Sequence, residues 1–310
     1  MRGTFVRTLI DLAAADERIV LLTGDLGYMA LEPFIERFPS RFFNVGVAEQ
    51  NMTGIATGLA DAGRIPFVYS IATFATLRPY EFIRNGPIAH QLPVRIVGIG
   101  GGFEYGTQGL THHALEDVGV LRVQPGITIV VPADAAQAAS ALQATWDLPG
   151  PVYYRVGKDD RAVVAGLDGR FALGRIEEVR SGRDAVLLAS GAIATEALAA
   201  AGMLSSQGID AAVYVVAGLQ PAPAEALATA LGDVPFAVTV EAHSVVGGLG
   251  SLVAEVIAER SLACRLVRCG VRSTPDGVSG SQAFMQTRHG IDAEGLAASV
   301  RRALGRPAAA

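Results

Sequence analysis

Short apolar runs alternate with stretches of helical periodicity along the first half of the chain. The runs predict strands at 18–24, 42–47, 65–70, 93–100, 127–133 and 151–157. Within 48–62, the i, i+3, i+4, i+7 spacing of a buried helix face is met by Met52, Ile55, Ala56 and Leu59. A further helix is predicted over 134–147, with Asp134 at its N-cap. Strands that alternate with helices in this way predict an α/β fold, with a parallel sheet between helices.

The pattern changes after residue 157 and then starts again. Residues 158–184 are polar and rich in turn formers, which predicts a connector with room for a hairpin. Apolar runs then predict strands at 185–191, 210–218, 236–243 and 265–271, each with a helix near it. We therefore expect two domains, 1–168 and a smaller α/β domain over 169–310.

Composition limits the class of protein. Of the 310 residues, 50% are hydrophobic and 18% are charged, so the chain can bury large cores. The net charge of −5, without a basic stripe, argues against a nucleic-acid surface. The sequence contains no signal-type segment and no apolar run of membrane-spanning length. Cys264 and Cys269 fall in one predicted strand and point to opposite faces, which disfavours a disulfide and favours a cytoplasmic location.

Two glycine-rich segments, 97–106 and 245–259, could let a backbone approach an anion, but both also suit tight turns. Neither has a dinucleotide fingerprint or a P-loop ending. His112 and His113 lie in a loop after a predicted strand, where ligands gather in open α/β sheets. They could act as a general acid or hydrogen-bond donor, or could brace the loop. The sequence lacks a zinc motif, so we expect no protein-bound metal.

Glu49 stands where the predicted strand 42–47 turns into a helix, in "VGVAEQN". A carboxylate in the first turn of a helix is favoured by the helix dipole alone. It could equally be the proton-transfer group of an enzyme.

Three segments taken together carry a family resemblance: "FFNVGVAEQNMTGIATGLADAGRIPFVYSIATF", "LPVRIVGIGGGFEYGTQGLTHHALEDVGVLRVQPGITIVVPAD" and "GPVYYRVG". They closely resemble the pyrimidine-binding domain of transketolases. The later "EAHSVVGGLGSLVAEVIAE" is similar to the C-terminal domain of that family. The resemblance covers nearly the whole chain. Deoxyxylulose-phosphate synthases and the β subunits of 2-oxoacid dehydrogenases are similar more distantly.

The resemblance implies a cofactor, thiamine diphosphate, and residues that bind it. Glu49 should meet N1′ of the aminopyrimidine and promote removal of the thiazolium C2 proton. Phe74 and Tyr80 should pack against the pyrimidine ring, although aromatic residues at helical spacing are often core residues. Asp25 matches an acid near the cofactor and the subunit interface.

Substrate-binding residues are implied in the same way. His112, with His113 beside it in "THH", matches the histidine that faces substrate hydroxyls. Arg155 and Arg2 fall where family arginines hold the terminal phosphate of the substrate, a task that suits the planar guanidinium. Surface salt bridges are the competing explanation for both arginines.

One expected segment is missing. Family members hold the diphosphate through Mg²⁺ with a "GDG…N" segment in a preceding domain, and this sequence contains no such segment. The resemblance therefore implies the C-terminal subunit of a split transketolase, with diphosphate and Mg²⁺ held by an N-terminal partner. We expect an α2β2 heterotetramer with active sites at subunit interfaces, and exposed apolar surface on the isolated chain.

The substrate loop departs from the family pattern "GxDGPTH". It reads "GTQGLTHH", with Gln108 in place of Asp and Leu110 in place of Pro, and Met29 stands where a phosphate-contacting Ser is expected. Gln is neutral and can donate as well as accept hydrogen bonds, so a different hydroxyl arrangement should be tolerated. A modified sugar, such as a sulfosugar or a branched sugar, fits this loop better than an ordinary pentose phosphate.

Two other functions stay open. A decarboxylating enzyme of the deoxyxylulose-phosphate synthase or dehydrogenase β-subunit type would accept pyruvate and release CO₂. A scaffold or regulatory subunit could keep the fold without catalysis.

Overall fold

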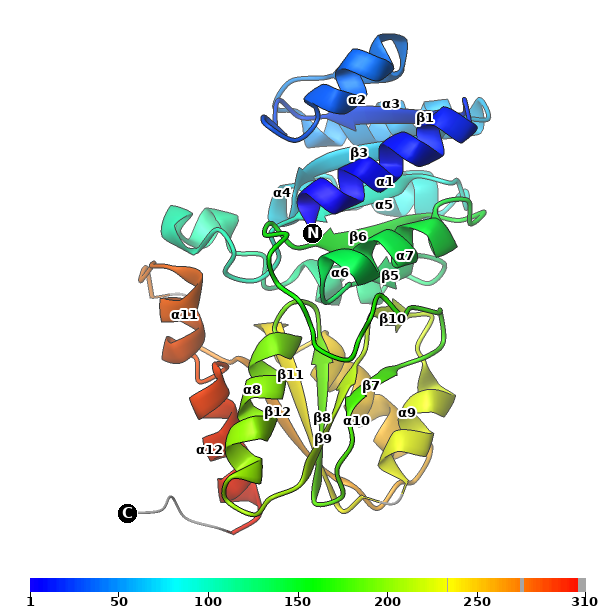
Figure 1. Cartoon of the computed structure of the whole chain (residues 1–310). Coiled ribbons are helices and arrows are strands. Elements are labelled where there is room, and N and C mark those ends of the chain that lie inside the picture. Colours follow the sequence, from blue (N-terminus) through cyan, green and yellow to red (C-terminus); the bar gives the residue numbers. More distant parts are fainter. Residues whose placement is uncertain (233, 274–275, 306–310) are drawn as a thin grey trace.

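The computed structural model describes residues 1–232, 234–273 and 276–305. They form two β-sheets, each covered by helices, with the larger sheet in the upper part and the smaller sheet in the lower part of Figure 1. The larger sheet has the strand order β10-β5-β6-β4-β3-β1-β2. Strands β1 to β6 pair in parallel, and β10 pairs antiparallel with β5. The bounds of its strands are β1 Ile19–Thr23, β2 Phe42–Asn44, β3 Ile65–Ile71, β4 Arg95–Ile99, β5 Thr128–Val130, β6 Val152–Val156 and β10 Gly218–Gln220.

The smaller sheet has the strand order β12-β11-β8-β9-β7. Its strands pair in parallel, except that β7 runs antiparallel to β9. Their bounds are β7 Glu177–Arg180, β8 Ala185–Ser190, β9 Ala211–Val215, β11 Phe236–Ser244 and β12 Arg265–Val271.

Helices cover both sheets. In the first half they are α1 Arg2–Ala15, α2 Glu32–Arg37, α3 Glu49–Asp61, α4 Ala72–Thr76, α5 Tyr80–Ile83, α6 Asp117–Arg122 and α7 Ala135–Thr145. In the second half they are α8 Ala194–Ser205, α9 Ala224–Leu231, α10 Leu249–Glu259, α11 Gln282–Arg288 and α12 Ala293–Ala303. Short turns of 3₁₀-helix, η1 Pro39–Arg41, η3 Gly106–Gln108 and η4 Leu110–His112, and one π-helical turn, η2 Arg84–Ile88, complete the set.

Strand β1 shows why the large sheet is buried on both faces. Val20 and Leu22 join the core on the α3 side, whereas Leu21 joins the core that contains α1 and α7. Successive side chains of a strand point to opposite faces, so a strand covered by helices on both sides has to be apolar throughout. This explains why the run 18–24 does not alternate with polar residues.

The fold class predicted from the sequence is confirmed, and each predicted run contains a strand. The run 210–218 is divided, however, because β9 ends at Val215 and Gly218 begins β10 of the other sheet. The predicted helices are α3 and α7, and the carboxylate of Asp134 accepts a hydrogen bond from the Gln137 backbone N–H at 2.9 Å. The run 42–47 is a strand only as far as Asn44, because the chain turns at Gly46 (φ +73°) to enter α3. Within 158–184 the structure contains the single strand β7 and not a hairpin.

Strand β10 joins the second half of the chain to the first sheet. It follows β9 of the small sheet directly, yet it pairs with β5 of the large one. The Val131 backbone N–H donates to the Ala217 carbonyl at 2.7 Å, and the Gln220 amide donates to the Gln124 carbonyl at 2.7 Å. The two halves therefore share backbone hydrogen bonds as well as side-chain contacts.

A buried ion pair lies at the same junction. Arg155 donates to Asp117 at 2.7 Å, and neither side chain is more than 7% exposed. Burial alone would raise the pKa of Asp117, but the charges of Arg155 and His243 and the hydrogen bonds from Arg155 and Tyr153 together lower that pKa. Arg155 also donates to the carbonyl of Ala242, at 3.1 Å. Because Ala242 belongs to β11, the pair is bonded to both halves of the chain.

Glu241 and His243 of β11 extend this junction. Glu241 accepts hydrogen bonds from the backbone N–H groups of Leu249 and Gly250, at 2.8 and 2.9 Å, at the start of α10. Burial nevertheless raises the pKa of Glu241 to about 7. His243 accepts from the Gly119 backbone N–H at 3.2 Å, and burial lowers its pKa. The second domain therefore holds α6 and α10 through buried polar groups.

Cys264 lies just before β12 and Cys269 within it, and both are buried free thiols, as expected. Within the described ranges, no helix is long and apolar enough to cross a membrane.

Candidate active site

The carboxyl ends of the parallel strands carry the predicted site residues. Gly24 follows β1, Glu49 follows β2, and Ser70 lies near the end of β3. The loop from Gly100 to His113 follows β4, and Lys158 comes two residues after β6. Since parallel strands end at one edge of a sheet, these groups gather where open α/β sheets bind ligands.

Glu49 is the first residue of α3 and is only 2% exposed. Arg78 donates to both of its carboxylate oxygens, at 3.1 and 2.9 Å, and the Ser70 hydroxyl donates at 3.3 Å. A Cβ on Gly24 would lie 3.6 Å from the carboxylate and 3.3 Å from the carbonyl of Gly46. Because Gly24 has no side chain, the space in front of the Glu49 carboxylate stays open to a ligand.

Arg78 links Glu49 to an aromatic cluster. Arg78 lies in the turn after α4, and its guanidinium carbon is 3.9 Å from the ring centroid of Phe74, four residues earlier. The Phe74 ring in turn meets the His112 ring edge-to-face, with centroids 5.0 Å apart. The structure therefore brings together Glu49, Phe74 and His112, three residues that lie far apart in the sequence.

His112 is half-buried at the end of η4, and its Nδ1 lies 3.0 Å from the Thr111 hydroxyl. Desolvation lowers the pKa of His112, and the charge of Arg78 lowers it further. Both effects favour the neutral imidazole, in which one ring nitrogen can accept a proton.

Tyr105 continues the cluster outward from His112, with ring centroids 6.1 Å apart. The Lys158 amine lies 4.5 Å from the centroid of the Tyr105 ring. Burial raises the pKa of both Tyr69 and Tyr105, and the charge of Arg2 opposes each rise. Basic side chains thus lie at the outer end of the cluster.

Other predicted residues have different surroundings. Asp25 is exposed beside the site, where its carboxylate accepts from the Asn44 amide at 3.0 Å and from the Tyr28 hydroxyl at 3.2 Å. Tyr80 packs against the buried core and accepts a hydrogen bond from the Gln124 amide at 2.6 Å. This contact joins the Tyr80 hydroxyl to the segment between α6 and β5.

His113 and Arg155 are enclosed. His113 is 6% exposed, and its Nε2 lies 3.0 Å from the Gly106 carbonyl. Arg155 is held by Asp117 and by backbone carbonyls at the junction of the two halves. Both side chains are bonded to the protein itself, and the substrate contacts that the resemblance implies for them stay predictions.

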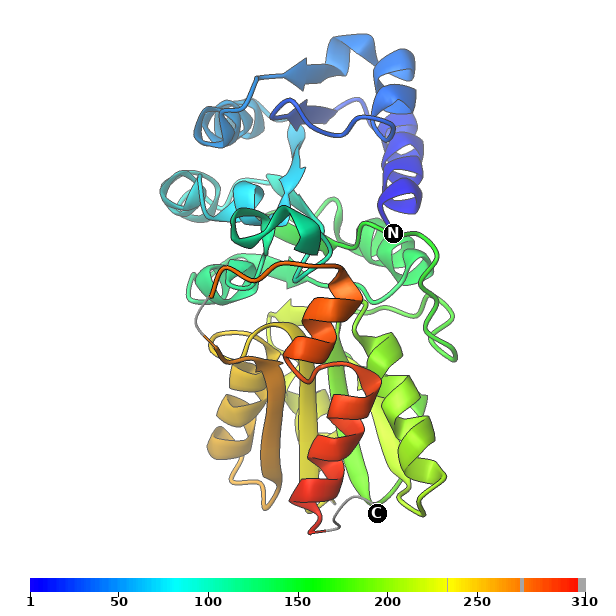
Figure 2. The ribbon, with the colours of Figure 1, turned by 90° about the vertical axis from the view of Figure 1, so that its left-hand side faces the viewer.

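Helix α11, from the second half of the chain, packs against the loop from Gly100 to His113. Figure 2 shows α11 beside the short helices η3 and η4, and α11 is in contact with η3. The His289 ring stacks on Phe103 at 5.1 Å with an angle of 5°, and Phe103 meets His113 edge-to-face at 5.1 Å. The second half of the chain therefore helps to position the loop that bears His112.

Gln108 and Leu110, the two departures from the family pattern, are exposed on this loop. The Thr107 hydroxyl donates to the Gln108 side-chain oxygen at 3.0 Å, which leaves the amide N–H₂ free to turn outward. Met29 is 92% exposed on the loop after β1.

Sequence reasoning missed four members of the cluster: Ser70, Arg78, Tyr105 and Lys158. The helical spacing of Phe74 and Arg78 was available as a signal, because residues four apart share a helix face. The other contacts depend on which loops meet at the sheet edge, and a single sequence does not show this.

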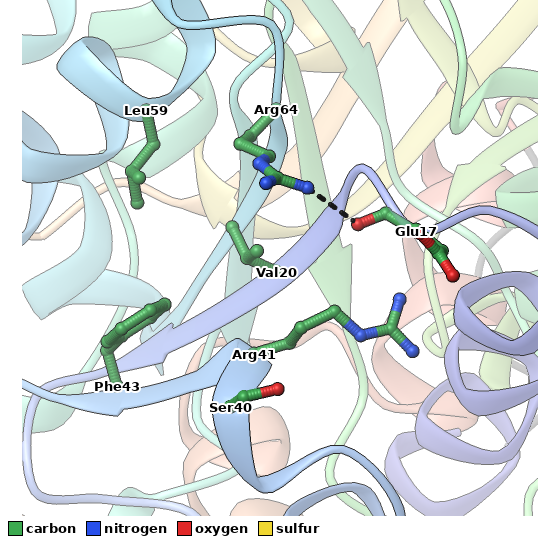
Figure 3. Close-up of a pocket in the computed structure, with 7 residues that line it drawn as sticks. All are labelled: Glu17, Val20, Ser40, Arg41, Phe43, Leu59 and Arg64. Atoms are coloured by element: carbon green, nitrogen blue, oxygen red, sulfur yellow. Dashed lines mark hydrogen bonds between the residues drawn. The ribbon is translucent and has the colours of Figure 1, made fainter.

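A separate pocket lies next to β1 and β2 and is lined by residues from both strands and from the segments around them (Figure 3). Its residues are Glu17, Val20, Ser40, Arg41, Phe43, Leu59 and Arg64. Arg64 donates to the Glu17 carbonyl at 3.1 Å, so its guanidinium is already engaged by the protein. No group of three or more metal-binding side chains is found in the part of the chain that the structure describes.

Two family models match the chain. The transketolase pyrimidine-binding domain matches residues 1–161, and the transketolase C-terminal domain matches residues 174–296. Among curated proteins, one of the subunits of an apulose-4-phosphate transketolase from Phocaeicola vulgatus is 36% identical over 95% of this chain and 94% of the relative. A 6-deoxy-6-sulfo-D-fructose transketolase subunit from Clostridium sp. (strain MSTE9) is also 36% identical, over 95% of this chain and 91% of the relative.

A solved structure of a split-gene transketolase, described as an inactive beta4 tetramer, is similar along its whole length. It is 36% identical, covers 98% of this chain and 97% of its own, and gives a TM-score of 0.88. With two matching family models in the expected order and relatives of similar length, this chain belongs to the transketolase family.

Proposed function

We propose that this chain is the C-terminal subunit of a split transketolase, which transfers a two-carbon ketol unit between sugars together with an N-terminal partner. The observation that carries the proposal is the buried carboxylate of Glu49 at the sheet edge, in one cluster with Phe74 and His112. Relatives of similar length are transketolase subunits, which supports a two-chain enzyme.

The residues present fit the pyrimidine end of thiamine diphosphate. A buried carboxylate suits a ring nitrogen that shares a proton, and Phe74 offers an aromatic face beside it. Gly24 keeps the approach to the carboxylate open. When bound, thiamine diphosphate supplies the electron sink for the two-carbon unit during its transfer.

Glu49 holds the proton that it shares with N1′ of the aminopyrimidine, and its burial excludes water from that contact. Arg78 donates to the same carboxylate oxygens, so it has to give up at least one of these hydrogen bonds when the ring is bound. Asp25 lies beside this position and closes it toward the partner subunit.

His112 accepts a proton from a substrate hydroxyl, since desolvation and the charge of Arg78 favour its neutral imidazole. Gln108 lies exposed on the same loop and reads a hydroxyl through its amide. An amide in place of a carboxylate favours a modified sugar, and the names of the two relatives, one an apulose-4-phosphate and one a sulfofructose transketolase, support this class.

The partner subunit holds the diphosphate and Mg²⁺ and covers the apolar surface around the site. Tyr28, Met29 and Val47 are 70%, 92% and 70% exposed next to Glu49 and Asp25, and a patch of this kind indicates a protein contact. An α2β2 assembly would place two such sites at subunit interfaces.

Calorimetry with thiamine diphosphate and Mg²⁺ tests the shared site, first with this chain alone and then with its partner. We expect binding only when both chains are present. Glu49→Gln should abolish turnover of the complex, whereas Glu81→Gln, which changes an exposed carboxylate of α5, should not. Tight binding to the lone chain would contradict the split site, and activity in the Glu49→Gln complex would contradict the assignment of Glu49.

A substrate screen separates the alternatives. Ketol transfer from a sulfosugar or branched-sugar donor supports the proposal, whereas a clear preference for xylulose 5-phosphate contradicts the modified substrate. Release of CO₂ from pyruvate would identify a decarboxylating enzyme, and loss of all cofactor binding would identify a scaffold.

A further inference from the structure

The pocket next to β1 and β2 lies at the opposite edge of the large sheet from the candidate active site. Glu17 comes two residues before β1, Arg41 directly before β2 and Arg64 directly before β3. These three strands run parallel, so the residues that precede them gather at the amino end of the sheet. Glu49 and the loop that bears His112 follow their strands and lie at the other end. A molecule in this pocket therefore lies apart from the proposed reacting groups.

Two guanidinium groups are anchored to one turn beside the pocket. Arg41 donates through a single nitrogen to the carbonyls of Asp16 and Ile19, at 3.2 and 3.5 Å. Arg64 donates through a single nitrogen to the Glu17 carbonyl at 3.1 Å. These carbonyls belong to the turn from α1 into β1, and Figure 3 shows both guanidinium groups beside it. Among the described residues, the other nitrogens of the two groups donate no hydrogen bond, so their N–H groups remain available to a ligand.

The positive charge of these two groups is not paired within the part of the chain that the structure describes, where no carboxylate lies within 4 Å of either guanidinium. Of the acids in the same turn, Asp16 pairs with Arg18 at 2.7 Å, and Glu17 is exposed. The Glu17 side chain points away from Val20 and Phe43 in Figure 3. Two like charges on one turn repel each other, and an anion between them relieves that repulsion.

The wall of the pocket opposite the charges is apolar. Val20 belongs to the core on the α3 side, and Leu59 of α3 packs against that core. Phe43 leaves 41% of its side chain exposed beside them. The cavity has a volume of about 470 Å³, within the range of about 300–1,000 Å³ that small-molecule sites occupy. A bare oxyanion would leave this wall in water, whereas a ligand with an apolar ring or chain would cover it.

We propose that this pocket binds a small organic anion, in which a carboxylate or a phosphate group is attached to one apolar ring or short chain. The oxyanion accepts hydrogen bonds from the free N–H groups of Arg41 and Arg64, because a planar guanidinium matches both kinds of oxyanion. The apolar part lies on Val20, Leu59 and Phe43. The site requires neither a cofactor nor a partner chain, so it stands independently of the proposed function.

Ligand-observed saturation-transfer NMR on the full chain tests the site. The probes are benzoate and phenyl phosphate, and benzyl alcohol is the matched ring without an anionic group. A ligand of about ten heavy atoms with ordinary efficiency has a dissociation constant on the order of 1 mM, so the titration should extend to roughly 30 mM. We expect saturable binding of at least one anion, and binding of benzyl alcohol that is about fivefold weaker or more. Binding of benzoate alone or of phenyl phosphate alone supports the site and identifies its oxyanion.

Substitutions locate the binding. Arg64→Met should weaken binding of the anion about fivefold or more, because it removes one exposed guanidinium without opening the core. Arg64→Lys, which keeps the charge but loses the planar group, should retain part of the affinity. Arg175→Met is the matched control, since it removes an exposed arginine just before β7, and it should leave binding unchanged. Glu17→Gln removes the carboxylate from the pocket lining and should tighten binding.

Several results would overturn the proposal. Absence of saturable binding by both anions up to roughly 30 mM would do so. Equal binding of benzyl alcohol would show an apolar surface that does not recognise an anion. Unchanged binding in a folded Arg64→Met variant, or equal losses in Arg64→Met and Arg175→Met, would place the anion elsewhere on the protein. Weaker binding in Glu17→Gln would contradict an anionic ligand group at this position.

Discussion

The contact between Arg78 and Glu49 gives a quantitative prediction for the stability of the isolated chain. Glu49 is 2% exposed, and Arg78→Met would leave its carboxylate with the Ser70 hydroxyl at 3.3 Å as its remaining side-chain partner among the described residues. Methionine keeps much of the length and apolar surface of the arginine stem but removes the charge and the donors. The substitution therefore isolates the ionic part of the contact.

The magnitude follows from the burial of the two partners. Removing one partner of a fully buried ion pair costs about 3–5 kcal/mol, because a charge stays buried without compensation. Arg78 is 43% exposed, so water can reach part of the space that it leaves. We therefore expect Arg78→Met to lower the free energy of unfolding by about 2 kcal/mol. In a Glu49→Gln background no buried carboxylate loses its partner, so Arg78→Met should lower the free energy of unfolding by less than about 0.5 kcal/mol.

Urea unfolding of the four proteins in this cycle, followed by far-ultraviolet circular dichroism, measures the coupling energy, and equal m-values would validate the comparison. Arg84→Met is the matched control, because Arg84 is exposed and its side chain donates only to its neighbour Asn85, at 3.1 Å, among the contacts of the described chain. An equal cost of Arg78→Met with and without the Glu49 charge would refute the reasoning.

Three further predictions concern the buried polar groups and the glycines. Burial raises the pKa of Glu241 to about 7, so the folded chain binds this proton more tightly than the unfolded chain does. The free energy of unfolding should therefore fall by on the order of 3 kcal/mol as the pH rises from about 4.5 to about 7. Glu241→Gln should remove this part of the decline, as the difference between urea midpoints at pH 5 and pH 8 would show; an unaltered decline would contradict it. Asp117→Asn should destabilise by about 3 kcal/mol or more, because Arg155 then keeps a buried charge, whereas Asn in place of the exposed Asp61 should change stability by less than about 0.5 kcal/mol. Gly98→Ala would place a Cβ 2.9 Å from the Ala72 backbone and should lower the melting temperature. At Gly58 an added Cβ meets nothing within 4 Å, so Gly58→Ala should leave the melting temperature equal or higher. Similar effects of the two substitutions would contradict the close packing at Gly98.

The sequence predicts most of the framework. Buried strands leave continuous apolar runs, and Asp134 marks the start of α7, so local patterns are sufficient for these elements. Strand β10 escaped prediction because three residues carry little pattern, and its place is decided by an open edge of a sheet built from a distant part of the chain. Helix α1 was not predicted either, although Phe5, Val6 and Leu9 lie on its buried side.

The site is predicted less completely than the fold. Motif resemblance points to Glu49, Phe74 and His112, which the structure brings together. A motif does not report which groups the protein itself already bonds: Arg155 is held by Asp117, a residue distant in the sequence. The contacts of each residue therefore come from the structure, and the roles that the resemblance implies stay predictions.

The position of strand β10 limits how this protein can be divided. Residues 218–220 belong to the second half of the sequence but form the last strand of the first sheet. A fragment that ends near residue 168 would leave β5 as an unpaired edge, which favours aggregation. A chimera that exchanges the first sheet of this chain should therefore include the segment through Gln220.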